Sequence, residues 1–398
     1  MWPPSFSLRW LCGLLGTALA FGAESPPPWP GIVGEIHGRL EMLSSAPALQ
    51  WSLTAMPSEP GWPKLALRAE GEGTLMEAEI DLLPAAPDAL RWRLKSFELD
   101  LARWSGALAA QWPELAGVTL GGRVLVSGEG EWCDGRLSGR VLVRLSEGRV
   151  DVPAKKLTLE GLEFALQIDD LAARRTAPAQ VFTLRGGHYD VITLGAGRFV
   201  FALDGDKVQV AEAVLEALGG RLILAPFAVA LTNPDVTVAA RAEQIDVTLL
   251  LPLLPPVMAE AHGHLNGDLT FRRDSTGIQI LQGHLGLNPG EVADLLLAPS
   301  PGVFTRQLPT IPAYVVKLFY PWLAKIENGE VPIRAHRMDV DFTPTLDAEG
   351  HSGTVRIEGG PPGSAHEAPL LLDLNVYGPL EPLIRFGADS RMHFGGTP

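Results

Sequence analysis

The chain has 398 residues, of which 46% are hydrophobic and 20% charged, so it is a globular sequence long enough for one large or two medium domains. Its formal net charge of −14 disfavours nucleic acid and anionic membrane surfaces as partners of its outer face. The 43 glycines and 34 prolines are spread between short apolar runs, as is typical of a chain with many turns. These features together predict an all-β fold.

Residues 1–23 have the parts of a secretory signal. Arg9 precedes an apolar run from Trp10 to Phe21, and Ala18-Leu19-Ala20 forms a small-x-small cleavage site. The run is short for a membrane span, and an uncleaved N-terminal anchor is the alternative. We therefore expect export. If the segment is cleaved, Cys133 is the one cysteine of the mature chain, and no intrachain disulfide forms.

Residues 24–120 are expected to form an N-terminal β segment with one short helix. Short alternating apolar runs between residues 32 and 100 are broken by Gly and Pro and predict strands. In the stretch 101–115, Trp104, Leu108 and Trp112 recur at helical spacing. We expect this stretch to be a helix laid over one end of a sheet.

A nine-residue pattern occurs twice in the rest of the chain, as GRLSGRVLV at 135–143 and GHLNGDLTF at 263–271. Each copy reads Gly-x-Leu-x-Gly-x-apolar-x-apolar, which places the apolar residues on one side of a strand and the polar residues on the other. The same alternation runs through residues 121–248, where Asp204-Gly205-Asp206 predicts a hairpin turn. The pattern indicates a sheet with one apolar face.

The C-terminal part alternates strands with two covering segments. Asp246 is placed to cap the apolar stretch 247–258, which its prolines break into a helical or 3₁₀ crossover. A hairpin is expected over 264–288, a kinked helix over 313–327, and three last strands over 338–342, 355–357 and 370–376. The whole chain is expected to hold about twenty strands and three short helices.

Histidines and carboxylates give little support to a metal site. His262 and His264 are expected to share one strand face, while hairpin pairing places His284 opposite Gly267, away from both. The acidic residues Asp339, Asp341, Asp347 and Glu349 lack the spacing of a calcium loop. Exposed strand histidines and a solvated acidic strand face are the expected outcomes.

No catalytic or cofactor motif is present in the sequence. It has no Gly-x-Ser-x-Gly elbow, phosphate-binding loop or His-Glu-x-x-His pair, so neither an enzyme nor a cofactor is expected. The aromatic group of Tyr314, Phe319, Tyr320 and Trp322 has helical spacing, which favours packing on a sheet end over contact with a membrane interface.

Several segments between Leu215 and Phe386 resemble the YdbH family, whose C-terminal part carries the label of a dicarboxylate-transport domain, and more distantly the AsmA and TamB proteins. The first 120 residues resemble this family in style alone. The segments that carry the resemblance are Leu218-Gly219-Gly220-Arg221, Pro226-Phe227, Asn288-Pro289-Gly290, Asn328-Gly329 and Leu372-Asp373-Leu374-Asn375-Val376-Tyr377.

The resemblance implies a long, curled antiparallel sheet, an AsmA-like open groove that moves phospholipid between the inner and outer membranes in the periplasm. It implies the cell envelope as location, with the N-terminal segment as an inner-membrane anchor if it is retained, and a small outer-membrane lipoprotein as partner of the C-terminal edge. We expect residues 121–398 to form the groove domain. The residues expected to line the groove are Val141, Val143, Leu145, Phe164, Leu166, Phe199, Phe201, Leu265, Leu269, Phe271, Leu285, Val340 and Phe342.

Two rival interpretations stay open on the sequence. In a closed β-sandwich, acting as an envelope scaffold or partner-binding protein, a second sheet would fill the same apolar face. A carbohydrate-active enzyme using the acidic residues is the more distant rival. The first rival differs from the groove in whether the apolar face is open or filled.

Overall fold

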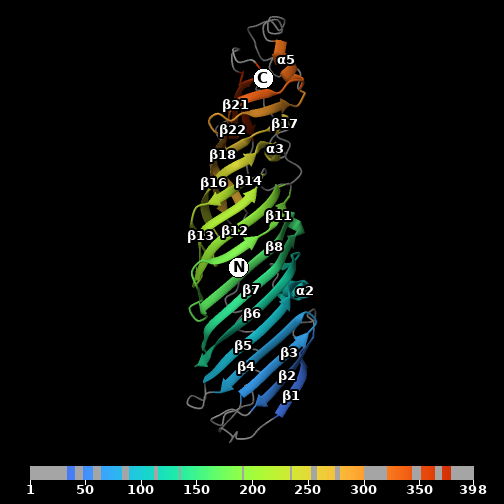
Figure 1. Cartoon of the computed structure of the whole chain (residues 1–398), viewed down its shortest axis with the longest axis vertical. Helices are drawn as coiled ribbons and strands as arrows, with labels where there is room; N and C mark the ends of the chain where they lie inside the picture. Colours follow the sequence, from blue (N-terminus) through green and yellow to red (C-terminus); the bar gives the residue numbers. More distant parts are fainter. Residues whose placement is uncertain are drawn as a thin grey trace. The chain divides into compact units, whose positions relative to one another are not determined.

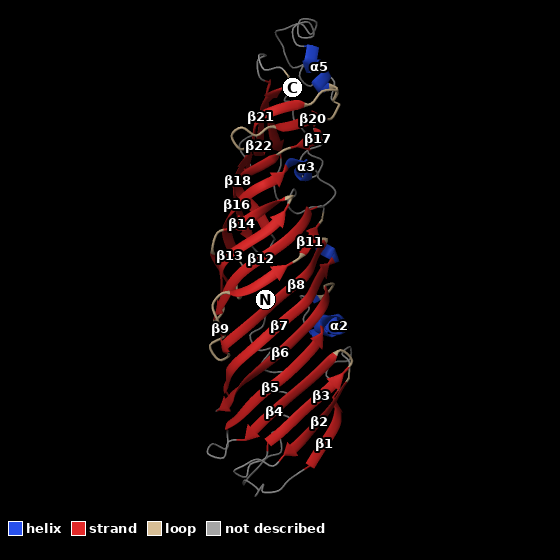
Figure 2. Cartoon of the chain, viewed as in Figure 1, coloured by secondary structure: helices blue, strands red, loops and turns tan. Residues whose placement is uncertain are grey.

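The strands of the chain form one antiparallel sheet in a computed structural model (Figure 1). The structure describes residues 34–40, 48–56, 64–82, 89–111, 115–133, 136–190, 192–233, 235–251, 258–273, 278–299, 321–342, 351–363 and 370–377. These residues contain 23 strands and few helices (Figure 2). The all-β prediction is confirmed.

The chain divides into two compact units. The N-terminal unit comprises Met1–Tyr189, Ala196–Ala211 and Phe227–Asn233, and the C-terminal unit comprises Asp190–Gly195, Glu212–Pro226 and Pro234–Pro398. The division predicted at residue 120 falls inside a strand, β6 (Thr119–Cys133).

The N-terminal unit begins with eight strands, each paired antiparallel with the next. They are β1 (Gly34–Leu40), β2 (Leu49–Met56), β3 (Lys64–Gly71), β4 (Thr74–Leu82), β5 (Ala89–Asp100), β6, β7 (Arg136–Val152) and β8 (Leu157–Asp170). The helix α2 (Leu101–Gln111) lies between β5 and β6 in sequence, and a 3₁₀ turn, η2 (Pro153–Lys155), lies between β7 and β8. The helix predicted from residue 101 is confirmed.

Shorter strands follow β8. They are β9 (Arg175–Thr176), β10 (Gln180–Leu184), β11 (Gly186–Tyr189), β12 (Ile192–Asp204), β13 (Lys207–Ala217) and β15 (Phe227–Ala230). β10 pairs with β8 on one side and with β12 on the other, so the meander continues past β8. Gly205 adopts a φ of 66° in the turn after β12, which is the conformation predicted for Asp204-Gly205-Asp206.

The C-terminal unit has further strands and two helices. Its elements are β14 (Gly220–Leu224), β16 (Val236–Asp246), α3 (Val247–Leu250), β17 (Met258–His262), β18 (His264–Arg273), β19 (Ile278–Gly286), β20 (Ala293–Leu297), α5 (Pro321–Glu327), β21 (Ile333–Phe342), β22 (His351–Gly360) and β23 (Leu370–Tyr377). The order of pairing is β14, β16, β18, β19, β21, β22, β23, and β17 joins β21 through β20.

Helix α3 begins as the sequence predicts. The Asp246 carboxylate accepts a hydrogen bond from the Thr248 backbone N–H at 2.8 Å, which satisfies one of the free N–H groups of the first turn. Helix α5 covers residues 321–327 of the helix predicted over 313–327, and the remainder lies outside the described residues, as do Tyr314, Phe319 and Tyr320.

The predicted register of the 264–288 hairpin is wrong by one residue. His284 lies opposite Asp268, and Gly267 lies opposite Leu285, because the pairing of β18 with β19 shifts between Thr270 and Phe271. His262 and His264 also do not share a strand, since Gly263 separates β17 from β18 with a φ of 148°. A local bulge of this kind leaves no clear mark in a two-residue periodicity.

Candidate functional site

The apolar residues of the N-terminal unit form continuous rows across its strands. Directly opposite residues in antiparallel strands point to the same side of the sheet. One row joins Leu99, Val124, Leu145 and Phe164 on β5 to β8, and it continues through Phe182 and Phe199 on β10 and β12. The next rows join Phe97, Val126, Val143 and Leu166, and then Leu94, Gly128, Val141 and Ile168.

Most side chains in these rows are partly exposed. We call this side of β5–β8, β10 and β12 the trough face. Its partly exposed members are Phe97, Leu99, Val124, Val126, Val141, Val143, Leu145, Phe164, Leu166, Ile168, Phe182, Phe199 and Phe201. Contiguous apolar surface of this kind is uncommon on a soluble protein and marks a surface that binds something apolar.

Phenylalanines concentrate where β8, β10 and β12 meet. Phe164 lies opposite Phe182, and Phe182 lies opposite Phe199. The rings of Phe182 and Phe199 have centroids 5.7 Å apart and an interplanar angle of 51°, a favourable tilted contact. Phe201 lies two residues further along β12 on the same side, opposite Gln180. The trough face is therefore most aromatic at this end.

Helix α2 covers one margin of the apolar side. Trp104 is 5% exposed and packs with Leu49 and Ala107, while its indole Nε1–H donates a 2.7 Å hydrogen bond to Thr74 Oγ1. Thr74 lies opposite Leu99, so the helix sits beside the Leu99 row. A second buried group, around Trp92 and Leu94, packs against Phe97, Val126 and Val141. Both groups border the trough face and leave its rows on β6 to β12 partly exposed.

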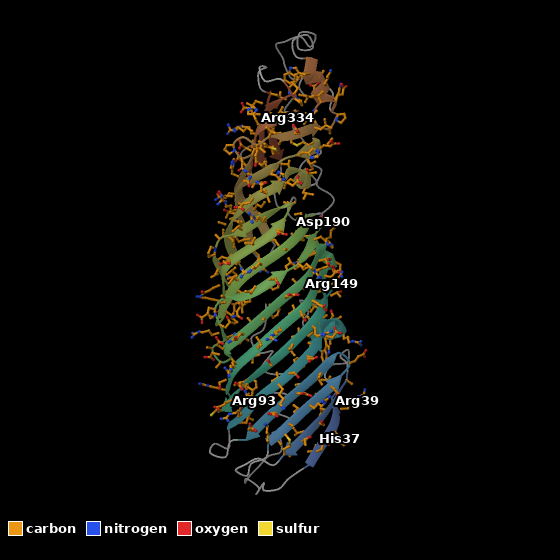
Figure 3. The ribbon with its side chains drawn as sticks, in the orientation of Figure 1. His37, Arg39, Arg93, Arg149, Asp190 and Arg334 are labelled. Carbon is orange, nitrogen blue, oxygen red and sulfur yellow. The ribbon has the colours of Figure 1, made fainter. Side chains whose placement is uncertain are left out.

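The opposite side of the sheet carries a ladder of ion pairs on β3 to β7. Glu79 lies between two lysines, with its carboxylate 2.7 Å from Lys64 Nζ and 2.6 Å from Lys95 Nζ. Hydrogen bonds from Lys64 and Lys95 lower the pKa of Glu79 to about 2. Arg140 Nε donates to Glu129 at 3.1 Å, and this contact holds the pKa of Glu129 below its usual value. Arg93 and Arg149, labelled in Figure 3, also form ion pairs, with Glu129 and Glu160.

The apolar side of the C-terminal unit is filled. Leu285, Val340 and Val355 form a row across β19, β21 and β22 and are 3%, 5% and 3% exposed. Val247 of α3, Leu295 of β20 and Ile326 of α5 belong to the same cluster, and each is 0% exposed. Strand β20 is paired within the sheet, and helices α3 and α5 help exclude water from a face that follows the same alternation as the trough face.

The predicted lining residues divide between these two environments. Those of the N-terminal unit lie on the trough face and are partly exposed: Val141, Val143, Leu145, Phe164, Leu166, Phe199 and Phe201. In the C-terminal unit, Leu265, Leu269, Leu285 and Val340 are buried in the packed cluster, and Phe271 and Phe342 pack against it. Their role in binding stays a prediction in both units.

Some trough-face residues were absent from the predicted set. Val124 and Val126 belong to a Gly-rich strand whose glycines weaken the apolar signal, and Phe97 precedes a helix in sequence. Phe182 lies on a strand of five residues, too short for a clear period. The alternation of Phe182 with Leu184 was the available signal for this position.

The predicted histidine and acidic residues lie on polar strand faces. His284 Nδ1 lies 2.7 Å from Asp341 Oδ1, and Arg337 Nε donates to Asp339 Oδ2 at 2.6 Å. Asp347 and Glu349 lie outside the described residues. Within the described ranges, no three histidine, cysteine or acidic side chains gather closely enough to hold a metal ion. Trp322 of α5 packs against the buried cluster, as its helical spacing indicated.

Comparison with protein families identifies a family that matches more than half of the chain. Residues 23–290 match the YdbH-like family, described as "Intermembrane phospholipid transport protein YdbH". The match includes the N-terminal unit's meander, which resembled the family in style alone, and it overlaps the segments noted from residue 215 as far as residue 290. Neither the comparison with curated proteins nor the comparison with solved structures gave a match.

Helices long and apolar enough to span a membrane are lacking in the described part of the chain. The family is named for transport and not for a chemical reaction, and its name implies the cell envelope as the place of action and phospholipid as the cargo. Because the match covers well over half of the sequence, the chain belongs to the YdbH-like family of intermembrane phospholipid transport proteins.

Proposed function

We propose that the trough face of the N-terminal unit holds the acyl chains of phospholipid in transit, without catalysis or cofactor. The observation that carries this proposal is the contrast in exposure. Val143, Phe164 and Phe199 remain partly exposed in continuous apolar rows, while Leu265, Leu285 and Val340 on the equivalent side of the C-terminal unit are buried. Family membership supplies the cargo class.

The energetics support an acyl chain as ligand. Each CH₂ group moved from water to an apolar surface contributes about 0.8 kcal/mol, so about ten buried methylenes offset about 8 kcal/mol of transfer from a bilayer. The trough rows offer side chains without hydrogen-bonding groups, so they discriminate little between chain types. The ion-pair ladder on the opposite side keeps that surface solvated and locally neutral.

We further propose that the protein works in the periplasm and meets a small outer-membrane lipoprotein at β23. Among the described strands, β23 pairs with β22 alone, and its other edge is the one that we propose accepts a partner strand. Leu371 on this edge strand is 57% exposed. Residues 388–398 lie outside the described part of the chain. We propose that these residues contribute to the docking site together with β23, so their removal is expected to leave lipid binding intact and to abolish recovery of the lipoprotein in a pull-down. Recovery of the lipoprotein at an unchanged yield would contradict this role.

Two neighbouring substitutions on β7 test the lipid proposal. Val143→Asp places a charge on the trough face, whereas Arg144→Asp changes the opposite side of the same strand. We expect native mass spectrometry to detect co-purifying phospholipid with the unmodified chain and with Arg144→Asp, and little with Val143→Asp, because a desolvated carboxylate costs several kcal/mol. Circular dichroism of each variant checks folding.

Equal lipid recovery from the two variants would place the lipid elsewhere. Absence of lipid from all three proteins would favour the scaffold interpretation, in which the trough face binds another protein. N-terminal sequencing of the purified protein tests export: a start near Phe21 supports cleavage, and retention of Met1 supports an inner-membrane anchor.

A further inference from the structure

The edge strand β1 lacks two of the features that protect sheet edges, a proline and a bulge. Its seven residues pair with β2 without a register shift, and the described residues provide no pairing for its other edge. A proline or a bulge hinders the pairing of an additional strand. Ile36 is 61% exposed, more than the other exposed large apolar residues of the described chain.

The sequence of β1, Gly-Glu-Ile-His-Gly-Arg-Leu, is complementary to itself in the antiparallel direction. If two copies pair about a two-fold axis through His37, Glu35 of each lies opposite Arg39 of the other. Ile36 of each lies opposite Gly38 of the other. Glu35, His37 and Arg39 are all exposed on the polar side, where Figure 3 labels His37 and Arg39. Opposite charges at directly facing positions stabilise a strand pair.

The apolar side of this pairing is complementary in shape. The Trp51 ring of β2 occupies the space where a side chain at Gly38 would lie. A Cβ at this position would be 2.9 Å from Trp51 Cε2. A facing Ile36 would therefore meet the partly exposed Trp51 ring across the glycine. Two such contacts would remove from water the most exposed large apolar side chain of the described residues.

We infer that β1 is a dimerisation edge, and that its occupant is β1 of a second copy of this chain in antiparallel register about His37. The interface is isologous, so each charge pair and each contact of Ile36 with Gly38 occurs twice. Ile36 shares an apolar row with Leu53, Leu67 and Ala78, and the dimer would join the apolar sides of two N-terminal units. A strand pair of seven residues buries a small area, so the dimer is weak and its population depends on concentration.

Charge reversal tests the register. In the full chain, Glu35→Arg places Arg opposite Arg39, and Arg39→Glu places Glu opposite Glu35. We expect each single variant to weaken the dimer at least about tenfold in analytical ultracentrifugation. The double variant Glu35→Arg/Arg39→Glu should restore the dimer, and an equimolar mixture of the two single variants should form a heterodimer. Glu98→Arg, an exposed reversal on β5, is the control and should dimerise normally.

A cysteine pair tests the same register without relying on affinity. In a chain with Cys12 and Cys133 replaced by Ser, His37→Cys places two thiols at directly opposite positions, within the Cα separation that a disulfide bridges. Glu35→Cys is the matched control, because its two copies would be about 13 Å apart along the strands. Mild oxidation is expected to cross-link the first variant and not the second.

A chain that stays monomeric at all concentrations would overturn the inference. So would a dimer that both single charge reversals leave unchanged, or equal cross-linking of the two cysteine variants, since either places the contact elsewhere. These outcomes do not depend on bound lipid. Failure of the dimer would therefore leave the lipid proposal standing, and loss of lipid binding would leave the dimer unaffected.

Discussion

The two copies of the nine-residue pattern differ in exposure at their seventh position. Their third position, Leu137 or Leu265, is buried in both units, and their ninth, Val143 or Phe271, is partly exposed in both. Val141 in the N-terminal unit is partly exposed, whereas Leu269, at the corresponding place in the C-terminal unit, is 8% exposed. Both belong to apolar rows on paired strands. The difference comes from covering helices, because Val247 of α3 and Ile326 of α5 belong to the packed cluster of the C-terminal unit. Strand alternation thus decides which side is apolar, and other segments decide whether solvent reaches it.

Shortening one apolar side chain in each unit is expected to give the largest difference in stability between the two units. Leu265 is 0% exposed, so Leu265→Ala leaves a cavity and is expected to lower the free energy of unfolding by about 3 kcal/mol. Val143→Ala, on the partly exposed trough face, is expected to cost about 1 kcal/mol or less. Urea denaturation of both variants measures the difference. Equal losses would mean that the trough face is packed as tightly as the C-terminal core.

Period-two alternation was sufficient to predict the strands and the apolar side. The antiparallel register keeps apolar residues of neighbouring strands directly opposite one another, except at bulges. This register places Val143, Leu145 and Phe164 on the apolar side. The alternation carries no information on covering. Ile326 reaches the cluster that contains Ile245 from a helix about eighty residues later in the chain, and no local pattern predicts that contact. The one-residue shift between β18 and β19 was unpredictable for the same reason, since a bulge is set by pairing.

The hydrogen bond between Trp104 of α2 and Thr74 of β4 tests whether a covering helix stabilises part of the N-terminal unit. Thr74 Oγ1 accepts from buried Trp104, so Thr74→Val should leave the indole N–H without a partner and cost about 1–3 kcal/mol. The double variant Thr74→Val/Trp104→Phe removes both polar groups and is expected to recover part of that loss. Thermal unfolding followed by circular dichroism measures both effects. A Thr74→Val variant as stable as the unmodified chain would show that the hydrogen bond to Trp104 does not help to hold α2 on the sheet.

The polar side of the N-terminal unit should respond to acid through Glu79. Its pKa is lowered from 4.5 to about 2 in the folded chain, so the ionised carboxylate stabilises the fold above pH 4.5. That stabilisation is lost as the pH falls from 4.5 towards 2. Glu79→Gln is therefore expected to cost about 1 kcal/mol at pH 7 and almost nothing at pH 2. A cost that stays constant across urea titrations at both pH values would exclude the two lysine contacts as its source.

Site-specific photo-cross-linking tests the central claim most directly. A photoreactive phenylalanine analogue is placed at Phe164 or Phe199 on the trough face, and at Leu285 or Val340 in the packed cluster, in chains that fold normally by circular dichroism. With radiolabelled phospholipid, we predict strong labelling at the first two positions and background labelling at the last two. Equal labelling at all four positions, or labelling confined to Leu285 and Val340, would contradict the assignment of the cargo to the N-terminal unit.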